Sequence, residues 1–290
     1  MSLTSSGCKI PLSVAFTFGV GSLAGLGLIG CAYATLCVNL LMATFSVVAL
    51  LRGDYRALHL WRRPEAPDPK RLFDMLRLGL PNAASITVEV TSYTLMALLI
   101  SRLGSLSAAS HQITSNMGAL LYMVPLSLSI ATSARVSYWI GANRPDLARA
   151  AIRHGFFWLV LCTLFTGLIL VVGRHLIARL YIQDEVVAEQ ASRLLGWMVW
   201  YQSVDALQVL CFFILRCYRV TLIPMGVYAT FLWGIGLTGG YWLAYEGIGP
   251  IEPLMGPEAF WISSSVALTI VSAVLGTLLW WVIRTRRHNG

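Results

Sequence analysis

The sequence predicts an all-α membrane protein, a polytopic bundle of about seven transmembrane helices. Of its 290 residues, 57% are apolar and 12% are charged, and the mean hydropathy is +0.71. Soluble globular domains carry about 25% charged residues, and disordered chains combine low hydrophobicity with high charge, so neither class fits. Long apolar runs without strand-like alternation pair their backbone groups as helices rather than as barrel strands.

Seven apolar runs are long enough to cross the roughly 30 Å hydrocarbon layer of a bilayer as helices. No charged residue lies between Lys9 and Arg52, and five glycines interrupt the first half of that run. We therefore expect one full span there, preceded by a short apolar stub at residues 10–18. A cleavable signal peptide is the alternative interpretation of the stub. The predicted spans are residues 30–51, 78–100, 106–134, 155–173, 194–215, 221–245 and 259–283.

The basic residues lie in the connections, and their distribution predicts an orientation. If the connection 52–77 is cytoplasmic and the sides alternate, sixteen of the Lys and Arg residues from position 52 onward lie inside and four lie outside. The positive-inside rule then places the C-terminus in the cytoplasm. The net charge of +8 comes without a basic groove lined by stacking aromatics, so we expect no nucleic-acid partner.

The connection 52–77 is charged and contains Pro64, Pro67 and Asp68, so we interpret it as a linker. It separates residues 1–51 from a six-helix bundle at residues 78–283, which a basic tail at residues 284–290 follows. In the shorter connection 141–154, Pro145 suits the first position of a helix, which predicts a short amphipathic surface helix.

Two acidic residues lie at mid-membrane depth. Glu89 is the twelfth of 23 residues in its predicted span, and Asp205 is the twelfth of 22 in its own. An ionisable side chain at that depth costs about 2.5–3.5 kcal/mol on insertion scales, so both are expected to face a protein interior or a wet cavity. This makes them candidates for a functional site. The alternative is a structural acid that is protonated or hydrogen-bonded.

Helical spacing places each acid within a stripe of polar side chains, and a third stripe follows in the span 106–134. Together they predict a polar chamber between helices, whereas polar packing between membrane helices is the alternative for any one stripe. The three stripes are Asn82, Ser85, Glu89 and Tyr93; Trp197, Tyr201, Asp205 and Gln208; and His111 with Ser115 beside Gln112 with Asn116.

Paired acids in such a chamber can exchange a proton, an inorganic cation and an organic cation, which is the chemistry of an antiporter. Pro81 and Pro125 offer positions where helices can bend during transport. A flippase for lipids or polysaccharides would also use a polar chamber, but paired acids favour cationic cargo. Neither a GxSxG nor an HExxH motif occurs, so no enzyme is predicted, and the six cysteines form no CxxC pair for zinc.

Four segments of the sequence form a recognisable series. They are RLGLPNAASITVE from Arg77, SRLGSLSAASHQITSN from Ser101, MVPLSLSIATSARVSYWIGANRPDLARAAIRHG from Met123 and YQSVDALQVL from Tyr201. These segments resemble the multidrug and toxic compound extrusion (MATE) family, in its NorM branch. The first looks like the opening helix of that family's C-terminal lobe, and the others follow in the family's order.

The resemblance implies a twelve-helix antiporter of two lobes that expels cationic drugs in exchange for sodium ions or protons, with no cofactor. Glu89 matches the acid of the family's seventh helix, and Tyr201 and Asp205 match the tyrosine and aspartate of the tenth. These three residues are therefore expected to bind the coupling cation, with sodium at Glu89 and Asp205. Asn82, Ser85, Tyr93, Gln112, Asn116 and Gln208 are the expected chamber-lining residues. The expected location is a bacterial inner membrane.

The chain departs from the family pattern at two places. It resembles the C-terminal lobe but only the end of the N-terminal one, with residues 1–51 as the remnant, so we expect an N-terminally shortened form. The alternative function is then an incomplete, non-transporting subunit that needs the missing lobe or a second copy. In addition, the family's typical Leu-Arg-Gly with a following acidic residue is replaced by LRCYRV from Leu215.

Overall fold

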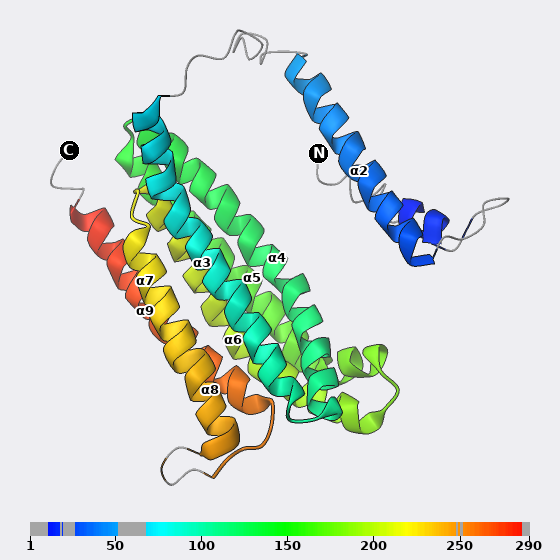
Figure 1. Ribbon diagram of the computed structural model, residues 1–290. Coiled ribbons are helices and arrows are strands. Elements are labelled where there is room, and N and C mark those ends of the chain that lie inside the picture. The colour runs from blue at the N-terminus through cyan, green and yellow to red at the C-terminus, as the bar shows by residue number, and fades with distance from the viewer. Residues whose placement is uncertain are drawn as a thin grey trace. The chain divides into compact units, whose positions relative to one another are not determined.

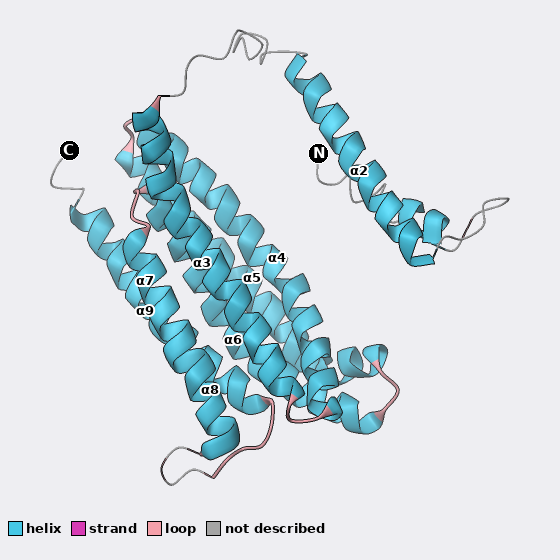
Figure 2. Cartoon of the chain, viewed as in Figure 1, coloured by secondary structure: helices cyan, strands magenta, loops and turns pink. Residues whose placement is uncertain are grey.

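The computed structural model describes residues 11–17, 19, 27–51, 68–247, 249 and 252–285 (Figures 1 and 2). Within these ranges the chain is helical and contains no strand, which confirms the predicted all-α class. The chain divides into two compact units, Met1–Asp68 and Pro69–Gly290. The division falls inside the connection predicted as a linker.

The first unit holds helix α2, Gly27–Leu51, which matches the predicted span 30–51. Residues 11–17, within the predicted stub 10–18, also form a helix. The two helices meet at Gly30, which is buried and where an added Cβ would overlap the carbonyl oxygen of Phe16. Glycine is therefore the residue that permits this close approach.

The second unit contains the remaining six spans. Including α2, seven helical segments of the described residues are long and apolar enough to cross a membrane, as predicted. In the second unit they are α3 (Pro69–Ser101), α4 (Ser105–Gly141), α5 (Pro145–Tyr181), α6 (Glu185–Cys217), a composite span of α7 (Leu222–Phe231), η2 (Leu232–Thr238), α8 (Gly239–Tyr241) and η3 (Trp242–Glu246), and α9 (Glu258–Thr285).

Several helices extend beyond the apolar runs that predicted them. At 1.5 Å per residue, the 37 residues of α4 or α5 measure about 55 Å, against a hydrocarbon thickness of about 30 Å. An apolar run marks only the part of a helix that lies in hydrocarbon. For this reason α3 begins at Pro69, and residues 69–77, predicted as linker, are helical.

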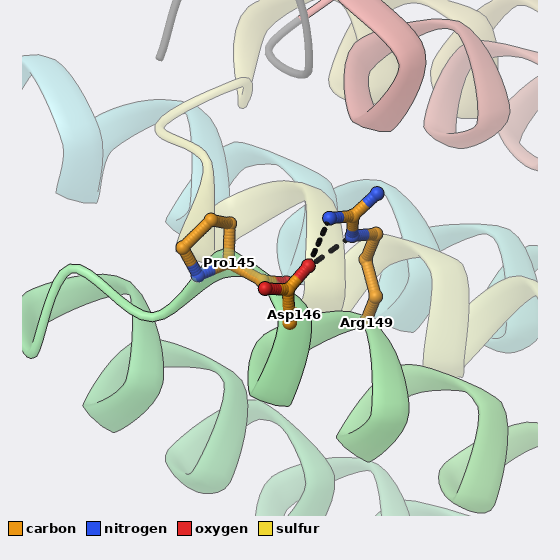
Figure 3. Close-up of polar contacts among 3 residues, drawn as sticks. All are labelled: Pro145, Asp146 and Arg149. Carbon is orange, nitrogen blue, oxygen red and sulfur yellow. Dashed lines mark hydrogen bonds and ion pairs between the residues drawn. The ribbon is translucent and has the colours of Figure 1, made fainter.

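The start of α5 corrects a second prediction. Pro145 does occupy the first turn, but residues 145–154 are the beginning of the long helix rather than a separate surface helix. Arg149 pairs with Asp146 and donates a hydrogen bond from Nε to the carbonyl oxygen of Pro145 at 3.3 Å (Figure 3). An acidic residue in the first turn also suits the positive end of the helix dipole.

The two turns at one end of the bundle share a backbone motif. In the α4–α5 turn, Arg144 N–H donates to the oxygen of Trp139 at 2.9 Å, and Asn143 has a φ of 55°. In the α6–α7 turn, Val220 N–H donates to the oxygen of Leu215 at 3.1 Å, and Arg219 has a φ of 62°. Both are Schellman turns, in which glycine or asparagine is usual at the left-handed position. The LRCYRV segment therefore forms a tight turn with an arginine, Arg219, at the left-handed position.

Helix α6 is the central helix of the second unit, and α4, α5 and α9 pack around it. Its N-terminus is capped by Asp184, whose Oδ1 accepts hydrogen bonds from the N–H groups of Val186 at 2.9 Å and Val187 at 3.4 Å. Buried side chains follow at helical spacing along its length, including Leu194, Leu195, Met198, Asp205, Val209 and Leu210. Residues on α6 are thus held by neighbours on several sides.

The composite span packs closely against α9. Its η2 and η3 segments are π-helical, a rare conformation that often occurs near functional sites. Ser263 Oγ on α9 donates to the carbonyl oxygen of Ile235 at 2.6 Å, and Trp233 Nε1 donates to that of Val88 on α3 at 3.4 Å. A Cβ on Gly240 would lie 2.7 Å from Phe260 Cδ1 and 3.2 Å from its Cα. The glycine therefore sets the spacing of the two helices.

We expect Gly240→Ala to lower the free energy of unfolding by roughly 1–3 kcal/mol, because the added methyl group overpacks the contact with Phe260. Gly226→Ala is the matched control, since nothing lies within 4 Å of a Cβ at that position of the same span. Thermal unfolding of the purified proteins in detergent measures both effects. Equal unfolding temperatures for the two variants would contradict the packing argument.

Candidate functional site

The two mid-membrane acids line one cavity of about 290 Å³, which we call the acidic cavity. Glu89 reaches it from α3 and Asp205 from the central helix α6, where Asp205 is only 5% exposed. Tyr201, one turn before Asp205, lines the same cavity, as does Tyr93 on α3. Positions 116 residues apart in the sequence thus line one cavity, as the polar stripes predict.

An adjoining cavity of about 320 Å³ lies next to the acidic cavity and contains Asn82, Ser85 and Gln208. Glu89, Val90, Tyr122 and Tyr228 line both cavities. The adjoining cavity also reaches Arg216, an exposed residue in the last turn of α6. Glu89 therefore lies where the acidic cavity and the adjoining cavity meet, and the adjoining cavity extends toward the end of the bundle.

Aromatic rings form one wall of the acidic cavity around Trp261 of α9. The Trp261 side chain is fully buried, and its ring centroid lies 5.2 Å from that of Tyr201 in an edge-on arrangement. The rings of Tyr93 and His111 lie 6.5 and 5.8 Å from it. Ring faces carry partial negative charge, so this wall can assist cation binding alongside the carboxylates.

Three buried polar atoms belong to residues that line these cavities and have no hydrogen-bond partner among the described residues. Trp261 Nε1 and Gln202 Nε2 belong to residues of the acidic cavity, and Gln208 Oε1 belongs to one of the adjoining cavity. Buried polar groups are normally paired, so these three atoms are exceptions next to the two cavities.

Seven of the nine predicted site residues line one of the two cavities, and Gln112 and Asn116 line neither. Those two are exposed on α4, where Gln112 Nε2 donates to Asn116 Oδ1 at 3.2 Å. Trp197 of the second stripe also lies outside both cavities. The spacing placed Gln112 and Asn116 on one helical face but did not tell which way that face points.

Several cavity residues were absent from the sequence prediction. Tyr122 does continue the His111 and Ser115 stripe at helical spacing through Gly118, so that periodicity could have found it. Trp261 and Tyr228 lie within apolar runs without a polar stripe, and no sequence pattern distinguishes them from core aromatics. Their place in the site follows only from how α9 and α7 pack.

The described residues contain no group of three or more His, Cys, Asp or Glu side chains placed to hold a metal ion. The acidic cavity is lined by two carboxylates together with hydroxyl and amide side chains, whose oxygens are the hard ligands that alkali and alkaline-earth cations prefer.

Comparison with known proteins agrees with the four segments quoted above. The MatE family model matches residues 81–242, which include Glu89, Tyr201 and Asp205. The chain belongs to the MatE family. Among its relatives, the probable multidrug resistance protein NorM of Aromatoleum aromaticum is 37% identical over 95% of this chain. The multidrug resistance protein MdtK of Pectobacterium atrosepticum is 34% identical over 93% of it.

The chain spans 59% of the length of both relatives. Its fold is also that of solved MatE-family transporters. The crystal structure of the eukaryotic MATE transporter AtDTX14 matches 99% of this chain and 63% of that one, with a TM-score of 0.84 at 21% sequence identity. At that identity the likeness concerns the fold, which agrees with the predicted membrane helix bundle.

Proposed function

We propose that this chain takes part in the efflux of cationic drugs by antiport against sodium ions or protons, with Glu89, Tyr201 and Asp205 binding the coupling cation. The observation that carries the proposal is the meeting of both mid-membrane carboxylates in the acidic cavity. The relatives are named as multidrug resistance proteins, which supports the same class of cargo.

Two carboxylates in one low-dielectric cavity repel each other when both are ionised. A proton or a metal cation bound there relieves the repulsion, and an organic cation competes for the same charge. Occupancy by one cation therefore lowers the affinity for another, and this mutual exclusion couples the two movements. Glu89 is the natural point of exchange because it lines both the acidic and the adjoining cavity.

The alternative is a membrane subunit that binds the coupling cation but moves no cargo without an N-terminal lobe or a second copy. The chain spans about three-fifths of the length of its relatives. Alternating access works by rocking one bundle against another around the binding site. Under this alternative, the helices of the second unit move cargo only when a second bundle, from an N-terminal lobe or a second copy, packs against them.

We further propose that the chain lies in the bacterial inner membrane with its arginine-rich end in the cytoplasm. That end comprises the start of α3, the α4–α5 and α6–α7 turns and the end of α9, which lie together in Figure 1. Arg77, Arg144, Arg149, Arg216, Arg219 and Arg284 belong to it. The opposite connections, at residues 102–104, 182–184 and 247–257, carry one basic residue, Arg102, so the distribution of basic residues supports this orientation.

For the cation site, we expect Glu89→Gln and Asp205→Asn to weaken sodium or proton binding on the order of ten- to a hundredfold, because each removes a charged ligand. Binding of radioactive sodium to purified protein, and proton release in its absence, measure the loss. Asp184→Asn is the matched control for Asp205, since it makes the same change on the same helix and asparagine also caps helices well. Unchanged binding in both cavity variants would contradict the assignment.

Transport by the chain alone separates the two functions. We expect the 290-residue chain, produced in an efflux-deficient bacterium, to expel ethidium, and both carboxylate variants to lose this activity. Efflux that survives both substitutions would contradict coupling by these acids. Cation binding without efflux, in protein confirmed to be in the membrane, would establish the subunit alternative.

For orientation, we expect a green fluorescent protein fused after Gly290 to fluoresce and alkaline phosphatase fused there to stay inactive, because the first matures in the cytoplasm and the second outside it. A fusion in the connection between η3 and α9, after Glu252, should give the opposite pair of results. The reverse pattern at both positions would contradict the proposed orientation.

A further inference from the structure

A pocket of about 460 Å³, separate from the two cavities above, lies between the start of α3 and the α6–α7 turn. We call it the turn pocket. Arg77 and Asp74 line it from α3, and Arg219 and Thr221 line it from the turn. Its other lining residues are apolar, namely Leu78, Val220, Leu222 and Ile223. Two arginines against one carboxylate leave the pocket with a positive charge.

The arginine at position 219 is held at a conformational cost. Its φ of 62° lies in the left-handed region, which costs a residue with a Cβ about 1–2 kcal/mol relative to glycine. The equivalent position of the α4–α5 turn holds Asn143, a residue that tolerates this conformation. Neither Arg219 nor Arg77 forms an ion pair with another described residue. Glycine or asparagine would suit this position of the turn better than arginine. The side chain of Arg219 instead lines the pocket.

The beginning of α7 adds further donors to the same pocket. Thr221 is only 6% exposed, yet its side chain makes no capping hydrogen bond to the helix that follows. The N–H groups of Leu222 and Ile223 belong to the first turn of that helix and have no partner within it. Helix N-termini with free N–H groups bind anions such as phosphate.

The apolar side of the pocket is open. Leu222 and Ile223 are each 57% exposed, and they directly follow Thr221 in the sequence. The predicted spans begin at residues 78 and 221, so the turn pocket lies where hydrocarbon gives way to the polar interface. A ligand here meets positive charge on one side and exposed apolar side chains on the other.

We propose that the turn pocket binds an anionic phospholipid, with its phosphate-bearing headgroup between Arg77 and Arg219 and an acyl chain along Leu222 and Ile223. Basic pockets between transmembrane helices suit such headgroups. A free phosphate ion would use the same donors but would leave the exposed apolar pair without a role. The site is independent of cation binding in the acidic cavity, so either proposal can fail without the other.

The test measures binding of phosphatidylglycerol to the purified full chain by native mass spectrometry, with phosphatidylcholine of the same acyl chains as the uncharged comparison. We expect phosphatidylglycerol to bind more tightly, and to weaken about fivefold in Arg77→Gln or Arg219→Gly and about thirtyfold in the double variant. Asp74→Asn is expected to tighten binding, because it removes the opposing charge.

Arg219→Gly is expected to fold normally, because glycine removes the strain of the left-handed backbone conformation. Its unfolding temperature should equal or exceed that of the wild type. Arg144→Gln is the matched control, because it removes one charge at the same end but outside the pocket. The proposal is overturned if both lipids bind alike, if the double variant binds as the wild type does, or if Arg144→Gln loses as much. Displacement of the lipid by millimolar inorganic phosphate would also overturn it in favour of a free-phosphate site.

Discussion

An ionisable group near the centre of a bilayer must be neutralised, paired or surrounded by polar atoms, because hydrocarbon offers no other stabilisation. Two such groups, Glu89 and Asp205, impose this requirement on the second unit of this protein. The structure meets it by placing Asp205 on the most enclosed helix, α6, and turning Glu89 of α3 toward the same cavity. The arrangement of the surrounding helices follows from enclosing that space.

The helices around the acidic cavity contribute in different ways. Helix α6 holds the acid in a rigid setting because α4, α5 and α9 pack against it. The composite span supplies Tyr228 and contains two π-helical segments, and its close contact with α9 depends on Gly240. A well-packed helix that carries the charge, beside a span of irregular helical geometry, suits the cation exchange that we propose for this site.

The sequence was sufficient for the parts of the structure that bilayer physics determines. The lengths of the apolar runs predict the seven spans found in the described residues. Depth within a span singles out Glu89 and Asp205, the two acids that line the acidic cavity. The sequence was insufficient where helix packing determines which face of a helix points toward the cavities. The stripe of Gln112 and Asn116 points away from both cavities, and Trp261 gave no signal because a buried tryptophan in an apolar run has the same pattern anywhere. Helix ends were missed at Pro69 because helices continue beyond hydrocarbon.

The central claim is that Glu89 and Asp205 together hold one cation in the acidic cavity. Anomalous diffraction from crystals soaked in a thallium or rubidium salt tests this most directly, because these ions replace smaller monovalent cations and reveal their own position. The structure predicts a single strong peak between the two carboxylates in the cavity, absent in crystals of Asp205→Asn. A peak elsewhere, or one in the cavity that survives this substitution, would contradict the claim.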